Sequence, residues 1–179
     1  MASSSTKPSM PTSSSWWPPG DDTLVDGGLT LLPWSQVGTI AGVREDLFVA
    51  STDPRMVAWT TVPSPFTSEM LNEFLDSVPE GVLRWAMVVE DRYAGNIELR
   101  LEPDDAAHFG YNTAPWARGR GVMSRAVKLV TDHAFGLGAK TLRISVLPGN
   151  IASRHVAEMN EYVFAGEHNG HVHYHRHAE

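Results

Sequence analysis

The chain has 179 residues, of which 42% are hydrophobic and 20% charged, a composition typical of a globular protein large enough for one self-sufficient core. Its formal net charge of −7 argues against nucleic acid as a partner, because that binding needs a basic surface. The lack of cysteine excludes disulfides, thiol catalysis and thiolate metal ligands, and no apolar run approaches the ~18 residues of a membrane span.

A polar segment opens the chain. The first twenty residues are rich in Ser, Thr and Pro and contain no apolar stretch of the kind found in a secretory signal. We therefore expect a tail over residues 1–24, one domain over residues 25–179 and a cytoplasmic location. Trp16 and Trp17 are unusual in such a segment, and we expect the pair to dock on the domain or on a partner.

The rest of the chain alternates between strand-like and helix-like periods. We expect a strand at 29–34, a helix or loop at 36–50, a turn at Asp53-Pro54 and a helix that starts at Thr67. Further strands are expected at 83–89, 94–101, 108–113, 141–147, 162–164 and 172–175, and further helices at 121–136 and 151–160. Antiparallel hairpins followed by strand–helix–strand–helix indicate an α/β (α+β) fold with a mixed sheet.

Residues 118–124 (RGRGVMS) join the predicted strand at 108–113 to the predicted helix at 121–136. Gly119 and Gly121 allow the backbone to approach a ligand closely, and the helix start supplies unpaired N–H groups and a positive dipole end. Arg118 or Arg120 adds positive charge. The motif lacks the Lys-Ser/Thr pair of a nucleotide P-loop, and the chain has no GxGxxG fingerprint. The arrangement therefore predicts a site for pyrophosphate.

Two longer segments, GYNTAPWARGRGVMSRAVKLVTDHAF and AKTLRISVLPGNIASRHVAEMNEYVFAGE, resemble the acyl-CoA-binding half of the GCN5-related N-acetyltransferases (GNATs), in the style of the RimJ/RimL type. The resemblance is strong over residues 108–167 and weaker back to Leu29. It implies the GNAT fold, which is a mixed, mostly antiparallel twisted sheet that is splayed at its central strands and flanked by helices. It also implies a monomer or a homodimer.

The same resemblance implies acetyl-CoA as the acyl donor and no required metal. In such proteins the strands matching 108–113 and 141–147 splay apart, and the pantetheine arm pairs with exposed backbone amides between them. The implied cofactor-binding residues are Tyr111, Asn112, Thr113, Arg118, Gly119, Arg120, Gly121, Val122, Met123, Ser124, Asn150 and Ser153. Asn150 also suits a helix N-cap, and the two roles are compatible.

Acetyl transfer to an amine defines which catalytic groups to look for. The amine must be neutral, and the oxyanion needs a donor, which we place at a backbone N–H within 111–113. Ser153 matches a serine that the resemblance assigns to the departing thiolate or the cofactor sulfur, although a first-turn serine also satisfies local backbone. Relatives often place a Tyr one turn further along the helix, and here that position is Ala157.

The general base has no direct counterpart in this chain. RimL-like enzymes have been assigned a Glu on the strand after the second helix, but this chain is short there, with residues 166–170 leading almost directly into the final strand, so that assignment does not carry over. Glu98 and His108 lie on adjacent predicted strands, and we expect them to face the gap between the splayed strands. The competing interpretations are a solvent-exposed Glu98–Arg100 face and a purely structural His108.

Two more features need an explanation. Glu161 stands where the family usually has Gly in a turn, and Glu adopts positive φ at a cost. We therefore expect that turn either to be strained or to differ, with Asn160 taking the left-handed conformation. Near the C-terminus, four histidines alternate with other residues, which on a strand places all four imidazoles on one face: His171, His173, His175 and His177. A solvated edge strand is the default interpretation, and a metal site is the alternative.

The leading function is an acetyl-CoA-dependent N-acetyltransferase (EC 2.3.1 class) in which a primary amine attacks the thioester directly. The acceptor is a protein or peptide N-terminus, or a small amine such as an antibiotic or metabolite, and neither nucleic acid nor a membrane is an expected partner. We expect the acceptor wall to come from residues 52–75, Trp85 and the loop near 164–171. The alternatives are a GNAT that uses another acyl-CoA, such as succinyl-CoA, and a non-catalytic acyl-CoA sensor that has lost its base.

Overall fold

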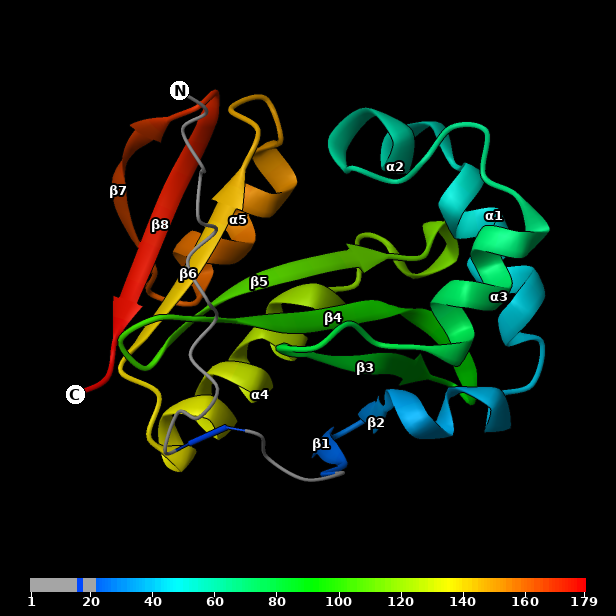
Figure 1. The fold of residues 1–179 in the computed structure, drawn as a ribbon, viewed down its shortest axis with the longest axis horizontal. Coiled ribbons are helices and arrows are strands. Elements are labelled where there is room, and N and C mark those ends of the chain that lie inside the picture. Colours follow the sequence, from blue (N-terminus) through cyan, green and yellow to red (C-terminus); the bar gives the residue numbers. More distant parts are fainter. Residues whose placement is uncertain (1–15, 18–21) are drawn as a thin grey trace, which may run out of the picture.

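The computed structural model describes residues 16–17 and 22–179. In that part of the chain eight strands form one twisted sheet in the order β1-β2-β3-β4-β5-β6-β8-β7 (Figure 1). Neighbouring strands run antiparallel, except that β5 and β6 are parallel. The strands are β1 Leu24–Asp26, β2 Leu29–Pro33, β3 Val82–Val89, β4 Arg92–Glu102, β5 Ala106–Thr113, β6 Thr141–Val146, β7 Val163–His168 and β8 His171–His177.

The helices lie over the sheet and at both of its ends. In Figure 1, α1, α2 and α3 gather at the right-hand end, whereas α5 lies at the other end beside β6, β7 and β8. The helices are α1 Val43–Thr52, α2 Pro54–Trp59, α3 Ser68–Asp76, α4 Val122–Leu137 and α5 Ile151–Met159, with 3-10 turns η1 Trp34–Thr39 and η2 Pro115–Ala117. None of the helices in the described part of the chain is long and apolar enough to cross a bilayer.

The main core lies between the sheet and α4. Alternation along β4 turns Ile97 and Leu99 toward α4, where they join Val127 and Val130 in one buried cluster. Burial of each such side chain favours folding by about 1.5–3 kcal/mol. A second cluster, around Trp34 and other residues of η1, α1, α3, β3 and β4, anchors the helices at the end of the sheet. The opposite face of β4 is also buried, since Asn96 and Glu98 are 4% and 5% exposed, so both faces of this strand point inward.

The sheet opens between β5 and β6. These strands pair only where residues 106–108 meet residues 141–143, although β5 continues to Thr113 and β6 to Val146. On their outer sides β5 stays paired with β4, and β6 with β8. Alternate backbone groups of β5 beyond His108 therefore point into a gap rather than at a neighbouring strand. The expected mixed, mostly antiparallel and splayed sheet is confirmed.

A bulge in β4 accompanies this opening. The register between β3 and β4 shifts between Met87 and Val88, where Gly95 has a φ of 139°. A Cβ atom at Gly95 would lie only 2.2 Å from the backbone carbonyl oxygen of Asn112 on β5. Only glycine fits this contact, and a bulge of this kind increases the local twist of the strands. The bulge thus lies next to the end of β5 that borders the gap.

The two tryptophans near the N-terminus contact the domain. Trp16 is only 3% exposed and belongs to the main core, and its ring packs edge to face with Trp17 at a centroid distance of 5.2 Å. Docking on the domain, one of the two expected outcomes, is therefore what the structure shows. The other tail residues before Asp22 lie outside the described residues. Leu24, the last residue assigned to the tail, already pairs with Leu31 in the sheet.

The histidine-rich strand lies inside the sheet and not at its edge. β8 is flanked by β6 and β7, so the default interpretation as an edge strand is wrong and β7 is the edge. The four histidines share one face of β8, and Val172 and Tyr174 are buried on the other. No group of three or more His, Asp or Glu side chains in the described residues is arranged to hold a metal ion.

Candidate active site

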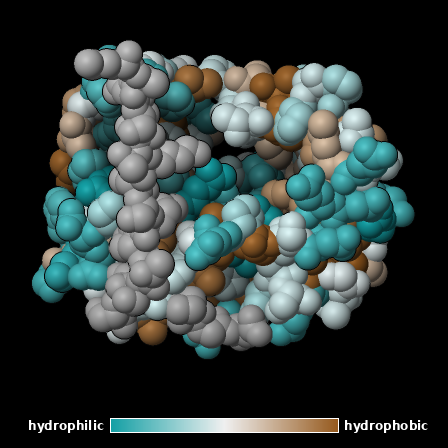
Figure 2. Space-filling model, in the orientation of Figure 1, coloured by the Kyte–Doolittle hydropathy of each residue, from teal (hydrophilic) through white to brown (hydrophobic). Residues whose placement is uncertain are grey.

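A cleft of about 730 Å³ lies where β5 and β6 diverge. Figure 2 shows the hollow between the side of the molecule that carries α2 and the side that carries α5. Four segments line it: the end of β5, residues 117–125, the first two turns of α5, and α2. Every predicted cofactor-binding residue except Arg120 lies on this cleft. Arg120 instead points toward Glu90, with 3.6 Å between Nη1 and Oε1.

Residues 118–124, called the phosphate loop below, form the turn into α4. Gly119 and Gly121 have φ angles of 75° and 70°, and Gly121 is the N-cap of α4 with no side-chain cap. An added Cβ would meet no atom within 4 Å at either glycine. The first-turn N–H groups of α4 have no partner within the helix, and together with the helix dipole they favour an anion. The loop can therefore hold a phosphate group by backbone contacts.

The start of α4 is tied to the end of α5. The side-chain amide of Asn160 donates to the backbone oxygen of Ser124 at 3.1 Å and to its Oγ at 3.2 Å. Asn160 has a φ of −99°, whereas Glu161 carries the positive φ of 63°. The expectation that Asn160 takes the left-handed conformation is therefore wrong. Its amide fixes the phosphate loop, and the exposed Glu161 adopts the strained angle and pairs with Arg176 at 3.2 Å.

The first turn of α5 faces β5 across the gap. Asn150 is the N-cap, and its Oδ1 accepts a hydrogen bond from the backbone N–H of Ser153 at 3.2 Å. The Tyr111 hydroxyl reaches the backbone oxygen of Ser153 at 3.5 Å. Burial raises the pKa of Tyr111 to about 12, so this hydroxyl stays protonated and acts as a donor. Ser153 is thus held on the cleft wall opposite β5.

Helix α2 forms a wall that the sequence interpretation reached only in part. Asp53-Pro54, taken above as a turn, is an N-cap followed by Pro at the first helical position, which is a helix-start signal. From α2 the cleft is lined by Arg55, Met56 and Trp59. The Trp59 ring reaches the turn before α5, because a Cβ on Gly149 would lie 3.1 Å from Trp59 Cη2.

Comparison with known proteins identifies the architecture. A family model described as "Acetyltransferase (GNAT) domain" matches residues 41–163, which is more than half of the chain. The chain belongs to this family of GNAT acetyltransferases. The GNAT assignment accounts for the splayed sheet, and it identifies the protein as an N-acetyltransferase of the type expected from residues 108–167. No curated protein sequence matches the chain.

Solved structures share the GNAT fold at low sequence identity. RimL, a ribosomal L7/L12 alpha-N-protein acetyltransferase in complex with coenzyme A, is 20% identical with a TM-score of 0.73, covering 87% of this chain and 98% of RimL. The ribosomal-protein-S5-alanine acetyltransferase from Vibrio fischeri is 21% identical with a TM-score of 0.72 over 89% and 98% of the chains. The microcin C7 self-immunity acetyltransferase MccE, in complex with acetyl-CoA and AMP, is 15% identical with a TM-score of 0.70 over 85% and 93%.

Neither expected base of this GNAT domain lies on the cleft. Glu98 is only 5% exposed, so the alternative of a solvent-exposed Glu98–Arg100 face is wrong for Glu98, although Arg100 is exposed. Its Oε2 accepts from Arg84 Nε at 2.9 Å, and its Oε1 accepts from Arg100 Nε at 2.9 Å and Nη2 at 2.5 Å. Two guanidinium groups therefore occupy the carboxylate, which leaves it unsuited to take a proton from an amine.

His108 is held at the closed end of the gap. Its Nδ1 lies 3.0 Å from Oε1 of Glu102, and Oε2 of the same carboxylate accepts a hydrogen bond from Arg143. His108 and Arg143 together hold the pKa of Glu102 below its usual range. Because His108 is the last β5 residue paired with β6, its side chain is separated from Ser153 and the open part of the cleft.

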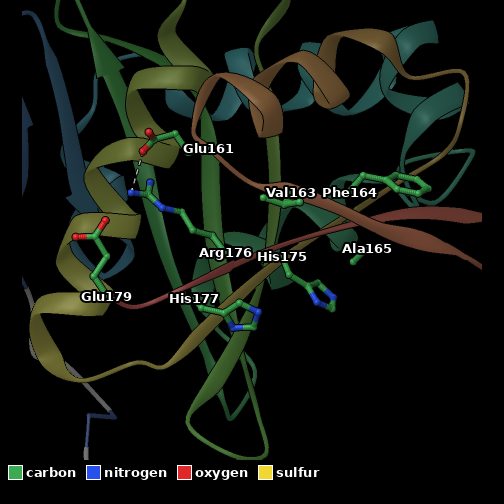
Figure 3. Close-up of a pocket in the computed structure, with 8 residues that line it drawn as sticks. All are labelled: Glu161, Val163, Phe164, Ala165, His175, Arg176, His177 and Glu179. Carbon is green, nitrogen blue, oxygen red and sulfur yellow. Dashed lines mark ion pairs between the residues drawn. The ribbon is translucent and has the colours of Figure 1, made fainter.

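Two other expectations about the acceptor wall also fail. Trp85 is buried in the main core, where its Nε1 donates to the backbone oxygen of Asp22 at 3.0 Å. From the segment near 164–171, Phe164 and Ala165 instead border a separate hollow of about 540 Å³ beside the start of β7 and the end of β8 (Figure 3), which shares no lining residue with the cleft. Of the expected acceptor wall, α2 is the part that lines the cleft. Sequence reasoning missed His155, which lies on the cleft from the exposed side of α5.

Proposed function

We propose that the protein transfers the acetyl group of acetyl-CoA to a primary amine. The observation that carries this proposal is the phosphate loop at the open end of the β5–β6 gap, since it combines an anion site with unpaired strand amides in one cleft. Membership of the GNAT family and the CoA ligands of RimL and MccE support acetyl-CoA as the donor.

Different residues along the cleft bind different parts of the acetyl-CoA donor. The backbone N–H groups of the phosphate loop bind the pyrophosphate, and Arg118 adds a positive charge beside it. The pantetheine arm enters the gap and pairs with free amides of β5 in the manner of an added strand. The thioester then lies near Tyr111 and Ser153, which face each other across the gap.

The chemistry requires little more than positioning. A neutral amine nitrogen attacks the thioester carbon, a backbone N–H within 111–113 stabilises the oxyanion, and the C–S bond breaks as the amide forms. The Ser153 hydroxyl stabilises the departing thiolate by donating a hydrogen bond and keeps its own proton. Since Glu98 and His108 lie off the cleft, we infer that water takes the proton that the amine loses. A protein α-amine, with a pKa of about 8, suits this route better than lysine, with a pKa of about 10.4.

The acceptor follows from the wall formed by α2. Met56 and Trp59 offer the cleft an apolar surface. RimL and the ribosomal-protein-S5-alanine acetyltransferase are named for protein acceptors, which supports an N-terminal α-amine. A small amine is the other acceptor class. The position of both expected bases off the cleft favours one contrasting function, a sensor that binds acyl-CoA without turning it over.

Thiol release from acetyl-CoA tests the reaction, measured with N-terminal peptides, lysine side-chain analogues and small amines. Amine-dependent release is expected, and Ser153→Ala should lower kcat by roughly tenfold to a hundredfold with little change in CoA affinity. Parallel reactions with succinyl-CoA test the acyl group. Tight CoA binding without release from any amine would instead establish the sensor function.

A matched pair of variants tests the phosphate site by calorimetry with CoA. Gly121→Asp and Gly121→Asn fill the same space, and both residue types tolerate a left-handed φ and an N-cap position. Only Asp adds a negative charge at the phosphate loop. We expect Gly121→Asp to weaken CoA binding at least tenfold more than Gly121→Asn, with a difference that shrinks at high salt. Equal affinities would place the phosphates elsewhere.

A further inference from the structure

One carboxylate joins two walls of the cleft that are far apart in the sequence. Oδ2 of Asp53 lies 2.7 Å from Nη2 of Arg118, at the start of the phosphate loop. The same oxygen accepts hydrogen bonds from the backbone N–H groups of Arg55 at 3.0 Å and Met56 at 3.3 Å. Asp53 therefore holds the first turn of α2 and the Arg118 guanidinium at the same time.

This ion pair is sheltered from solvent. The Arg118 and Asp53 side chains are 24% and 17% exposed. The hydrogen bond from Arg118 is the main reason that the pKa of Asp53 lies below its usual range, so the carboxylate is charged at neutral pH. Partly buried pairs are screened by salt less than pairs on the surface. The ion pair therefore links the start of α2 to the phosphate loop.

Arg118 retains the capacity to bind a second anion. A guanidinium carries five N–H donors in a plane, and the contact with Asp53 uses Nη2. The remaining donors are available on a residue that lines the cleft beside Gly119 and Gly121. A phosphate bound to the loop can therefore share Arg118 with Asp53, as the outer member of a phosphate–guanidinium–carboxylate bridge.

Helix α2 is the element that such a bridge would fix. It has only six residues, and its first two free N–H groups beyond Pro54 bond to Asp53. Its far end carries Trp59, whose ring contacts the Gly149 turn across the cleft. Whatever orders Asp53 therefore also orders the wall that we assign to the acceptor.

We propose that Asp53 is a positioning residue that transmits occupancy of the donor phosphate site, through Arg118, to α2. This inference rests on the proposed function, because it takes the CoA phosphates as the anion that Arg118 meets. A bound phosphate fixes the guanidinium, the guanidinium fixes Asp53, and Asp53 fixes the first turn of α2. The acceptor wall is consequently completed when the donor has bound.

The chain offers variants that separate this link from the helix cap. Asn and Ser cap helices about as well as Asp, so Asp53→Asn and Asp53→Ser keep the cap and remove the charge that pairs with Arg118. Asp46→Asn is a matched control, because Asp46 is also 17% exposed, pairs with Arg92 at 2.8 Å and does not line the cleft. Two independent variants at position 53 guard against a folding defect in one of them.

Hydrogen exchange of the full chain, followed by mass spectrometry with and without CoA, measures the coupling directly. In the wild type and in Asp46→Asn, CoA should slow exchange at least threefold both in residues 117–125 and in residues 54–60. In Asp53→Asn and Asp53→Ser, the slowing should persist in 117–125 and disappear in 54–60. During turnover, Asp53→Asn should raise the KM for the amine more than the KM for acetyl-CoA.

The possible outcomes distinguish the two proposals. Equal slowing in residues 54–60 in the wild type and both Asp53 variants would overturn the link, because CoA would then act on α2 directly. Slowing in the wild type that is confined to 117–125 would also overturn it. If CoA neither binds in calorimetry nor slows exchange in either segment, the proposed function itself fails.

Discussion

Replacing Glu98 with glutamine separates a structural role of this carboxylate from a catalytic one. Glu98 and Arg84 are each 6% exposed at the side chain, and Arg84 also lies 4.0 Å from the ring centroid of Phe74. Glu98→Gln keeps the shape but removes the negative charge, which leaves the Arg84 guanidinium buried without a counter-charge. Arg100, at 52% exposure, can return to water.

The cost follows from burial of the unpaired charge. Breaking one side of a buried ion pair typically destabilises a protein by about 3–5 kcal/mol, whereas an exposed pair contributes about 0–1 kcal/mol. Loss of the buried Arg84–Glu98 pair therefore destabilises the protein more than loss of the Arg100–Glu98 pair. We expect the free energy of unfolding to fall by about 3 kcal/mol and Tm by roughly 10 °C for a chain of this size. A general base would instead contribute about 10²–10⁴-fold to the rate.

Urea denaturation and acetyl-transfer kinetics on the same preparation provide the assay, with kinetics measured well below the lowered Tm. Glu98→Gln should be markedly less stable than the wild type but keep its kcat within about threefold of the wild-type value. Loss of a general base would instead lower the rate by about 10²–10⁴-fold. The double variant Glu98→Gln/Arg84→Met should recover stability, because no unpaired buried charge remains. A variant as stable as the wild type but more than a hundredfold slower would refute this reasoning and establish Glu98 as the base.

Two further predictions concern the bulge and pH. Gly95→Ala should lower the free energy of unfolding by at least about 3 kcal/mol, because its Cβ would lie 2.2 Å from the Asn112 oxygen. Gly28→Ala, with nothing within 4 Å, should stay within about 0.5 kcal/mol in the same urea titration, and equal losses would contradict the contact. Burial, with smaller contributions from Arg143 and His177, lowers the pKa of His175. As the pH falls, His175 is therefore protonated in the unfolded chain before it is protonated in the folded protein. The contribution of neutral His175 to the free energy of unfolding is fully present above a pH of about 6.5 and is lost as the pH falls through the folded pKa. His175→Gln should flatten the fall in Tm between pH 7 and 5, and an unchanged slope would argue against this assignment.

Local patterns were sufficient for most strands and helices, although not for β1 or α2, and they placed most of the predicted cofactor residues on one cleft. Apolar residues at alternate positions of β4 and at the helical period of α4 mark the faces that pack against each other, because this spacing is a property of residues a few positions apart. Gly119 and Gly121 were predicted to form an anion-binding turn, since positive φ and a bare helix start are also local properties. The predicted cofactor residues consequently meet in one cleft, with the exception of Arg120.

The errors arose where a partner came from a distant strand or helix. Glu98 was predicted to be exposed or to face the cleft, because the sequence of its own strand does not reveal that Arg84 lies beside it on β3. Asn160 was assigned the left-handed turn because the sequence does not show that its amide is engaged with Ser124, 36 residues away.

The sequence by itself determined the type of protein: a mixed sheet, a glycine turn at a helix start and the family that these residues resemble. The tertiary structure alone decided how the cleft is closed. Arg118 meets Asp53 65 residues earlier in the chain, and Trp59 reaches Gly149 on the opposite wall. The physical reason is that propensity and periodicity act over a few residues, whereas ion pairs and ring contacts depend on where complete elements pack.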